Sequence, residues 1–208
     1  DSCVTAAIAA REHATLAFLH ANYGQRTEQR ELRAFHAIAR HYDVRQTLVV
    51  SLAHLAAIGG SSLTDPHIPV SPADLHAHNV PTSYVPFRNA NMLAVAVSWA
   101  EVLGAGAVYV GAVEEDSSGY PDCRPQFYRL LNRLALIGTK AGVEGQRIQV
   151  VTPLIYLSKA NIIRLGKKLK VPYRFTWSCY AGKKKPCGKC DSWILRSRGF
   201  ADAGIKDP

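Results

Sequence analysis

Strand-like apolar runs alternate with helix-like amphipathic segments along this chain, and the alternation limits the choice of fold more than any other feature. The runs QTLVVSL (46–52) and AVYVGA (107–112) are almost continuously apolar, which is typical of strands buried on both faces. The expected strands are 15–21, 46–52, 107–112 and 148–154, and the expected helices are 27–42, 89–103, 126–141 and one that begins after Ser158. The order predicts an α/β fold in which helices cover both faces of a parallel sheet.

The chain begins with a helix rather than a strand. Val4, Ala7 and Ile8 recur at helical spacing directly after Asp1 and Ser2, which are good N-cap residues. In a right-handed βαβ unit this first helix needs a strand before it. We therefore expect the sequence to be a fragment that lacks its first strand and the loop after that strand.

Composition excludes two broad classes of protein. Hydrophobic residues make up 48% of the chain and charged residues only 20%, which excludes a disordered chain. No apolar run approaches the roughly 18 residues of a membrane span, so a membrane protein is not expected. The net charge of +9 suits anionic ligands, but charge alone does not choose among nucleotides, nucleic acids and other anions.

The cysteines suggest metal or redox chemistry in a reducing compartment. The chain has 5 cysteines, an odd number, and Cys179, Cys187 and Cys190 lie close together with a C-x-x-C pair among them. This usage predicts a cytoplasmic protein. Cys123 has no neighbouring histidine, so we expect a partly buried thiol there rather than a nucleophile.

Several stretches of the sequence resemble one family. They are NYGQRTEQREL (22–32), GGSSLTD (59–65), SYVPFRNANML (83–93), SSGYPDCRPQF (117–127), TKAGVEG (139–145), TPLIYLSKANIIRLG (152–166) and CGKCDS (187–192). In these stretches the chain is similar to the 7-cyano-7-deazaguanine synthase family (QueC/ExsB) of the PP-loop ATP pyrophosphatases. The resemblance implies an adenine-nucleotide alpha-hydrolase-like, Rossmann-type domain over 1–173 and a cysteine-rich zinc-type segment over 174–208.

The resemblance also implies an activity. The family is an ATP-dependent ligase that converts 7-carboxy-7-deazaguanine and ammonia to 7-cyano-7-deazaguanine, through an adenylated carboxylate, on the route to queuosine. ATP, Mg²⁺ and structural Zn²⁺ are the implied cofactors, and the partners are small molecules rather than nucleic acid or membrane. A homodimer stays open, because Trp99 or Trp193 could serve a subunit contact.

Asp1, Ser2, Arg88 and Lys159 are the residues that the resemblance assigns to ATP. Asp1 and Ser2 match the end of the family's Ser-Gly-Gly-x-Asp-Ser phosphate loop, and without the upstream glycines we expect the chain as given to bind ATP poorly. Arg88 and Lys159 begin helices, where a cation can reach phosphate, and we assign both a catalytic role on the leaving pyrophosphate. Taken alone, these residues are more readily interpreted as helix caps and solvated cations.

Asp116, Ser118, Tyr120, Asp122 and Arg124 are the residues that we assign to the substrate. They follow the strand 107–112 and so belong at the carboxyl edge of the sheet, where open α/β sheets bind ligands. A deazaguanine acid needs an acceptor for its N–H edge, a flat surface and a cation for its carboxylate. Without the resemblance, a polar surface loop would be the simpler interpretation.

Cys179, Cys187 and Cys190 match the family's zinc site with one departure. The family has a fourth cysteine where this chain has Trp193, and an indole cannot ligate a metal. Structural zinc takes four tetrahedral ligands, so a histidine from elsewhere, a water or nothing completes the site. We expect zinc to bind here more weakly than in a four-cysteine relative.

Two other functions stay open. One is a PP-loop enzyme that thiolates or amidates tRNA, and the other is a relative that binds a deazapurine or a partner without catalysis. Pyrophosphate release that depends on the deazaguanine acid, rather than on tRNA, separates these alternatives from the ligase.

Overall fold

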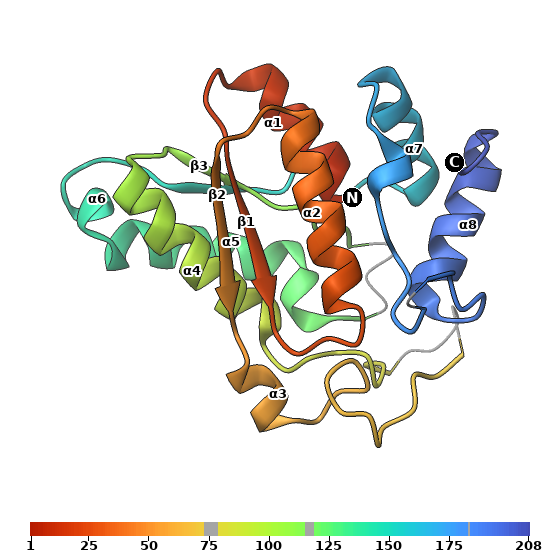
Figure 1. The fold of residues 1–208 in the computed structure, drawn as a ribbon. Coiled ribbons are helices and arrows are strands. Elements are labelled where there is room, and N and C mark those ends of the chain that lie inside the picture. The colour runs from red at the N-terminus through yellow and green to blue at the C-terminus, as the bar shows by residue number, and fades with distance from the viewer. Residues whose placement is uncertain (73–78, 115–118, 183) are drawn as a thin grey trace.

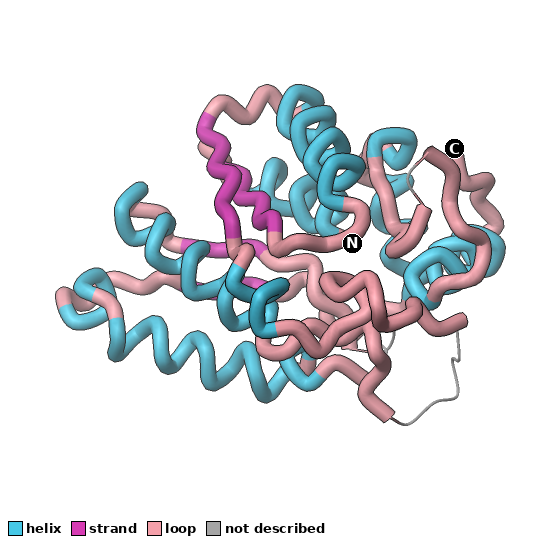
Figure 2. Tube along the Cα trace, turned by 60° about the horizontal axis from the view of Figure 1, so that its bottom comes forward, coloured by secondary structure: helices cyan, strands magenta, loops and turns pink. Residues whose placement is uncertain are grey.

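Two pairs of parallel strands lie at the centre of the computed structural model, which describes residues 1–72, 79–114, 119–182 and 184–208. β1 (Ala17–Asn22) pairs with β2 (Gln46–Ser51), and β3 (Ala107–Tyr109) pairs with β4 (Gln149–Val151). Figure 2 shows them as separate pairs among the helices. The predicted parallel α/β architecture is confirmed.

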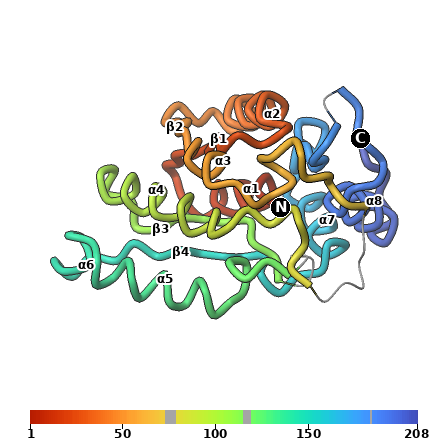
Figure 3. Tube along the Cα trace, turned by 90° about the horizontal axis from the view of Figure 1, so that it is seen from below, coloured from red at the N-terminus to blue at the C-terminus, as the bar shows by residue number. Residues whose placement is uncertain are grey.

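Helices lie on both sides of the strands. The described helices are α1 (Ser2–Glu12), α2 (Glu28–His41), α3 (His54–Ile58), α4 (Arg88–Leu103), α5 (Pro125–Gly138), α6 (Lys140–Val143), α7 (Lys159–Lys168) and α8 (Asp191–Ala203), with 3₁₀ turns η1 (Pro121–Cys123) and η2 (Tyr173–Phe175). In Figure 1, α7 and α8 lie side by side near the C-terminus. Seen from below in Figure 3, α2 and α5 lie on opposite sides with the strands between them. Within the described part of the chain, no helix is both long and apolar enough to cross a membrane.

The expected elements are largely observed, with differences at the strand ends and in the tail. β3 and β4 are shorter than the predicted runs 107–112 and 148–154, although the Val110 N–H still donates to the Val151 carbonyl over 2.9 Å. Neither α3 nor α8 is among the helices expected from the sequence. Gly199 of α8 leaves no room for a side chain, because a Cβ there would lie 2.3 Å from Cγ of Lys159. Close packing against α7, rather than apolar periodicity, therefore holds α8.

A buried apolar cluster joins α1 to α7. Val4, Leu154 and Ile162 are at most 1% exposed, and they form this cluster with their neighbours. Burying large side chains of this kind contributes about 1.5–3 kcal/mol each. The cluster holds the first turn of α1 close to the first turn of α7.

Gly111 brings the chain after β3 against the start of α1. A Cβ on Gly111 would lie 2.7 Å from the Ser2 nitrogen and 2.9 Å from the Asp1 carbonyl carbon, distances that backbone atoms do not tolerate. A glycine is therefore required here. As a result, Asp1 and Ser2 lie at the carboxyl end of β3.

Candidate functional site

Asp1 and Lys159, both predicted to bind ATP, form an ion pair. Lys159 is the first residue of α7, and its Nζ lies 2.9 Å from each carboxylate oxygen of Asp1. Asp1 occupies the N-cap position of α1 but makes no side-chain cap hydrogen bond. Ser158 does cap α7, since its Oγ accepts from the Asn161 N–H over 3.4 Å. The structure thus joins the two candidate nucleotide residues directly, and Asp1 orients the ammonium group.

Arg88 is the first residue of α4, and its guanidinium group forms hydrogen bonds with uncharged side chains. Its Nη1 donates to Tyr23 Oη over 3.2 Å, and its Nε and Nη2 donate to Asn89 Oδ1 over 3.3 and 3.2 Å. Its Cζ lies 5.4 Å from the centroid of the Tyr23 ring. Among the described residues, Arg88 makes no ion pair with a carboxylate. A guanidinium held in this way by neutral groups is available to an anionic ligand.

Asp122, from the predicted substrate loop, caps the N-terminus of α4. Its Oδ2 accepts from the Asn89 N–H over 2.9 Å, and its carbonyl accepts from Asn89 Nδ2 over 3.2 Å. Asp122 is only 3% exposed, and within the described part of the chain its Oδ1 has no hydrogen-bond partner. Burial raises the pKa of this carboxyl group above its usual value. The site therefore holds a buried acceptor for which the described residues provide no donor.

Tyr120 is buried near the Arg88 guanidinium group. Its hydroxyl lies 2.8 Å from Ser83 Oγ, and its ring centroid lies 5.6 Å from that of Tyr84. Burial raises the pKa of Tyr23, Tyr120 and Tyr180 above the usual tyrosine value, so their hydroxyls stay protonated at neutral pH. These hydroxyls and Arg88 form one polar cluster inside the protein.

The structure brings some predicted substrate residues together and leaves others apart. Tyr120 and Asp122 lie with Arg88, as described above. Arg124 is exposed at the N-cap position of α5. Asp116 and Ser118 lie outside the described residues. Two residues of the predicted loop thus lie near Arg88, and the role of the loop in binding substrate stays a prediction.

Four residues of the cluster had no role predicted from the sequence. They are Tyr23, Ser83, Asn89 and Tyr180. Tyr23, Ser83 and Asn89 occur in stretches that carry the family resemblance, and this was an available signal. Tyr180 had only its position next to Cys179 as a signal.

The Lys159 pair and the Arg88 cluster both include residues that lie just beyond the carboxyl end of a strand or contact a residue that does. Tyr23 follows the last residue of β1, Asp1 contacts Gly111 shortly after β3, and Lys159 comes after β4. The carboxyl edge of parallel strands is where α/β proteins bind ligands. Within the described residues the two groups share no hydrogen bond or ion pair, so a ligand that reached both would have to span them.

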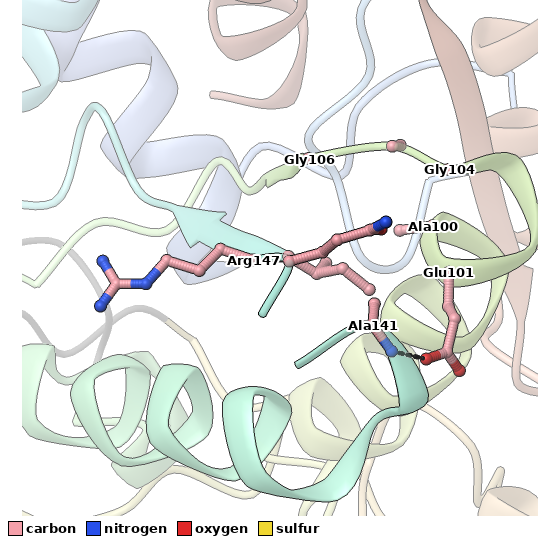
Figure 4. Close-up of a pocket in the computed structure, with 9 residues that line it drawn as sticks. Ala100, Glu101, Gly104, Gly106, Ala141 and Arg147 are labelled. Carbon is pink, nitrogen blue, oxygen red and sulfur yellow. Dashed lines mark hydrogen bonds between the residues drawn. The ribbon is translucent and has the colours of Figure 1, made fainter. Parts of the chain in front are cut away.

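A pocket of about 170 Å³ lies at the opposite edge of the strands. Gly106 and Ile148, which precede β3 and β4, line it. Figure 4 shows Glu101 accepting from the Ala141 N–H, over 2.8 Å, while the Arg147 guanidinium points away. None of the predicted site residues lines this pocket.

Cys179, Cys187 and Cys190 converge on one point. Their sulfur atoms all lie within 4.8 Å of one another, and no other described histidine, cysteine, aspartate or glutamate joins the group. Cys179 Sγ also accepts from the N–H groups of Gly182 and Cys187 over 3.1 and 3.2 Å. Such N–H groups stabilise a thiolate, and convergent thiolates are soft ligands that suit zinc. The residues fit a metal with three protein ligands.

Trp193 stands one helical turn beyond Cys190. Cys190 is the N-cap residue of α8, and its carbonyl accepts from the Trp193 N–H over 3.0 Å. The cysteines are free, with Cys179 and Cys190 buried and Cys187 partly exposed. The prediction that this cluster could hold a metal is confirmed in its geometry, whereas the identity of the metal stays a prediction.

Comparison with known proteins gives one consistent result. A family model described as queuosine biosynthesis protein QueC matches residues 1–204. A 7-cyano-7-deazaguanine synthase of Chlorobaculum tepidum is 55% identical over 208 residues, which cover 100% of this chain and 90% of that protein. Proteins of the same name from Chlorobium chlorochromatii and Chloroherpeton thalassium are 55% and 54% identical over the whole chain, and the match covers 90% and 91% of their lengths.

Proposed function

The chain belongs to the QueC family of queuosine biosynthesis proteins, and on this premise we propose that it is an ATP-dependent carbon–nitrogen ligase that makes 7-cyano-7-deazaguanine. The observation that carries the proposal is the position of Tyr120 and Asp122 beside Arg88 at the carboxyl edge of the strands. The described residues provide a buried acceptor with no donor among them, an aromatic ring and a guanidinium that makes no ion pair with any of their carboxylates, and a deazaguanine acid requires groups of these kinds.

Each of these groups has a proposed partner on the substrate. Asp122 Oδ1 accepts a hydrogen bond from the N–H edge of the base, and the Tyr120 ring provides the flat surface. Arg88 holds the carboxylate at the point where it meets the triphosphate, with Arg124 as a second cation on the surface. Asp116 and Ser118 complete the proposed contacts from the same loop. The alignment of substrate and nucleotide is the main contribution of such a site to rate.

Asp1, Ser2, Lys159 and Arg88 are the proposed nucleotide residues. We assign them a PP-loop site in which backbone N–H groups at the start of α1 face phosphate. Mg²⁺ would arrive with the triphosphate and neutralise part of its charge. Lys159 and Arg88 would neutralise the remaining negative charge as pyrophosphate leaves. This is electrostatic stabilisation of the charge that develops in the transition state.

The proposed reaction has two stages, and each stage begins when ATP adenylates an oxygen of the substrate. A carboxylate oxygen of the substrate attacks the α-phosphorus of ATP, and the bond to pyrophosphate breaks. Ammonia then attacks the acyl carbon, and AMP leaves with that oxygen while one proton is lost, which gives the amide. The amide oxygen attacks a second ATP in the same way, and departure of AMP with loss of both amide protons gives the nitrile.

Zinc is the proposed metal of Cys179, Cys187 and Cys190, with a structural role. When bound, it would cross-link the segment 174–208 through thiolates, which small cysteine-rich segments need for stability. We keep the division into a nucleotide-binding domain over 1–173 and this cysteine segment as part of the proposal.

A homodimer is part of the proposal as well. Leu130, Leu134 and Ile137 form one stripe along α5 and are 70%, 59% and 67% exposed. Exposed apolar stripes of this kind mark contact surfaces more often than free surface. Analytical ultracentrifugation of the native protein should give the mass of a dimer. A monomer at micromolar concentration would contradict the proposed homodimer.

Pyrophosphate release tests the function. The full-length protein should release pyrophosphate when 7-carboxy-7-deazaguanine, ammonia and ATP are all present, and mass spectrometry should find the nitrile. Release that needs tRNA instead would support a tRNA-modifying enzyme. Binding of the acid without pyrophosphate release would support a non-catalytic relative.

A further inference from the structure

Gly199 of α8 lies directly against the side chain of Lys159 at the start of α7. Gly199 is buried, and a Cβ added to it would lie 2.3 Å from Lys159 Cγ and 3.0 Å from Lys159 Cβ. The same atom would lie 3.0 Å from Ile163 Cδ1. Because Cβ and Cγ are the part of the lysine closest to the backbone, they cannot move aside as the far end of a flexible side chain could. Any side chain at residue 199 would therefore displace Lys159 or α8.

Two further contacts fix α8 to α7 close to this glycine. The Phe200 ring packs edge-on against Tyr173, with ring centroids 5.1 Å apart, and the Tyr173 hydroxyl donates to the Ile163 carbonyl of α7 over 2.9 Å. Arg164 Nη2 of α7 donates to the Asp202 carbonyl over 2.5 Å. Movement of α8 away from α7 would break these contacts, so displacement of the lysine side chain is the easier response.

The contact with Gly199 bears on where the Lys159 ammonium group lies. Lys159 Nζ is 2.9 Å from each carboxylate oxygen of Asp1, and the lysine side chain is only 17% exposed. Side chains occupy staggered rotamers, so a change of χ1 to another rotamer turns the rest of the side chain by about 120°. A change of this size at Lys159 would carry the ammonium group away from Asp1.

We propose that Gly199 is a positioning residue for the nucleotide site. Its missing side chain lets α8 cover Cβ and Cγ of Lys159, and this packing directs the ammonium group to Asp1 and to the phosphates of ATP. The segment 174–208 then shapes the nucleotide site in addition to holding the proposed zinc. The inference rests on the proposed function for the role of Lys159 in binding ATP.

A double-mutant cycle on the full-length protein tests this role. The probe is the magnesium complex of an ATP analogue in which a methylene group replaces the oxygen between the α- and β-phosphates, and calorimetry measures its affinity. Gly199→Ala and Lys159→Ala should each bind it about tenfold more weakly, the scale of losing a hydrogen bond to a charged group. The double variant should bind no more weakly than Lys159→Ala, because the glycine acts through the lysine.

Lysine labelling provides a readout that does not depend on ATP. Acetylation by an N-hydroxysuccinimide ester, followed by mass spectrometry, should modify Lys159 of the wild-type protein more slowly than the exposed Lys167. In Gly199→Ala the rate at Lys159 should rise several-fold, and the rate at Lys167 should not change. Gly138→Ala is the matched control, because a Cβ at this position of α5 meets only Leu134 Cδ1, at 3.8 Å. It should leave both the labelling rates and the affinity unchanged.

The outcomes separate this inference from the proposed function. Wild-type affinity or unchanged Lys159 labelling in folded Gly199→Ala would overturn the positioning role, and so would a double variant whose loss equals the product of the single losses. If Lys159→Ala bound the analogue as tightly as the wild-type protein, the proposed role of Lys159 would fail, and labelling would still decide whether Gly199 positions it. If Gly199→Ala alone does not fold, the added Lys159→Ala should restore folding, because it removes the Cγ at 2.3 Å. A double variant that also failed to fold would overturn the positioning role.

Discussion

The backbone N–H of Asn89 donates to Asp122 Oδ2 over 2.9 Å, so a carboxylate from the loop after β3 caps a helix that begins more than thirty residues earlier. Phe87, the N-cap residue of α4, makes no side-chain cap bond of its own. One Asp122 oxygen thus caps the helix, and the other, which has no hydrogen-bond partner among the described residues, is the one that we propose accepts from the substrate. Substitutions at Asp122 can therefore separate the capping of α4 from the proposed binding of substrate.

Asp122→Asn should separate binding from folding. The amide oxygen can still accept from the Asn89 N–H, but the amide nitrogen would present a donor where the base needs an acceptor. We expect KM for 7-carboxy-7-deazaguanine to rise at least tenfold, which is the usual effect of losing a hydrogen bond to a charged group. The free energy of unfolding should change by less than about 1 kcal/mol.

Asp122→Ala is the control for the cap. It removes both oxygens, so stability should fall by about 0.5–2 kcal/mol, the usual result of losing a helix cap. Equal KM values for Asp122→Asn and the wild-type protein would show that the second oxygen does not contact the substrate.

Cys123 should be inert toward alkylation at neutral pH. Burial first, and then the neighbouring Asp122 charge, raise the pKa of this thiol from 9.0 to about 11. At pH 8 its thiolate fraction is about a hundredfold lower than for a thiol with the ordinary value, because each pKa unit is a factor of ten. Labelling by iodoacetamide, followed by mass spectrometry, should therefore be slow at pH 8 and should rise steeply as the pH approaches 11. Rapid labelling of folded protein at pH 8, at the rate seen in urea, would contradict both the pKa shift and the buried position.

Local signals accounted for the elements that the sequence predicted correctly. Ser158 was expected to cap a helix and does so, because capping depends on a hydroxyl and an N–H three residues apart. The bounds of α2 and α4 agree with the expected helices 27–42 and 89–103 to within one residue. α8 was missed because its burial depends on Gly199 fitting against Lys159, a contact between distant parts of the chain.

The site was predictable only in part for the same reason. The family resemblance pointed to Tyr120, Asp122 and Arg88, which the structure does bring together. Tyr23 and Tyr180 act through contacts that span most of the chain, and no local pattern in the sequence predicts such contacts.

Gly111→Ala should destabilise the protein and weaken ATP binding together. The new Cβ would lie 2.7 Å from the Ser2 nitrogen, so the start of α1 would have to move away from β3. Overpacking of this kind typically costs about 1–3 kcal/mol, and the displaced Asp1 and Ser2 should raise KM for ATP. Gly106→Ala is the matched control before β3, because a Cβ there meets only the Arg147 carbonyl oxygen at 3.8 Å. Chemical denaturation of both variants gives the comparison, and equal stability would show that α1 does not need this close approach.

Trp193→Cys should strengthen metal binding. Cys190 is the N-cap residue of α8 and residue 193 follows one turn later, so a cysteine there would present its sulfur on the same side of the helix. A fourth thiolate would complete the tetrahedron that zinc prefers, and we expect the zinc dissociation constant to fall at least tenfold. Competition with a chromogenic chelator measures the affinity, and the visible absorption of the cobalt-substituted protein reports the number of thiolate ligands. Trp193→Ser, which removes the indole without adding a thiolate, should leave the affinity near that of the wild-type protein. If Trp193→Ser strengthened binding as much as Trp193→Cys, steric relief rather than a fourth ligand would explain the gain, and the three-thiolate description of the native site would be wrong.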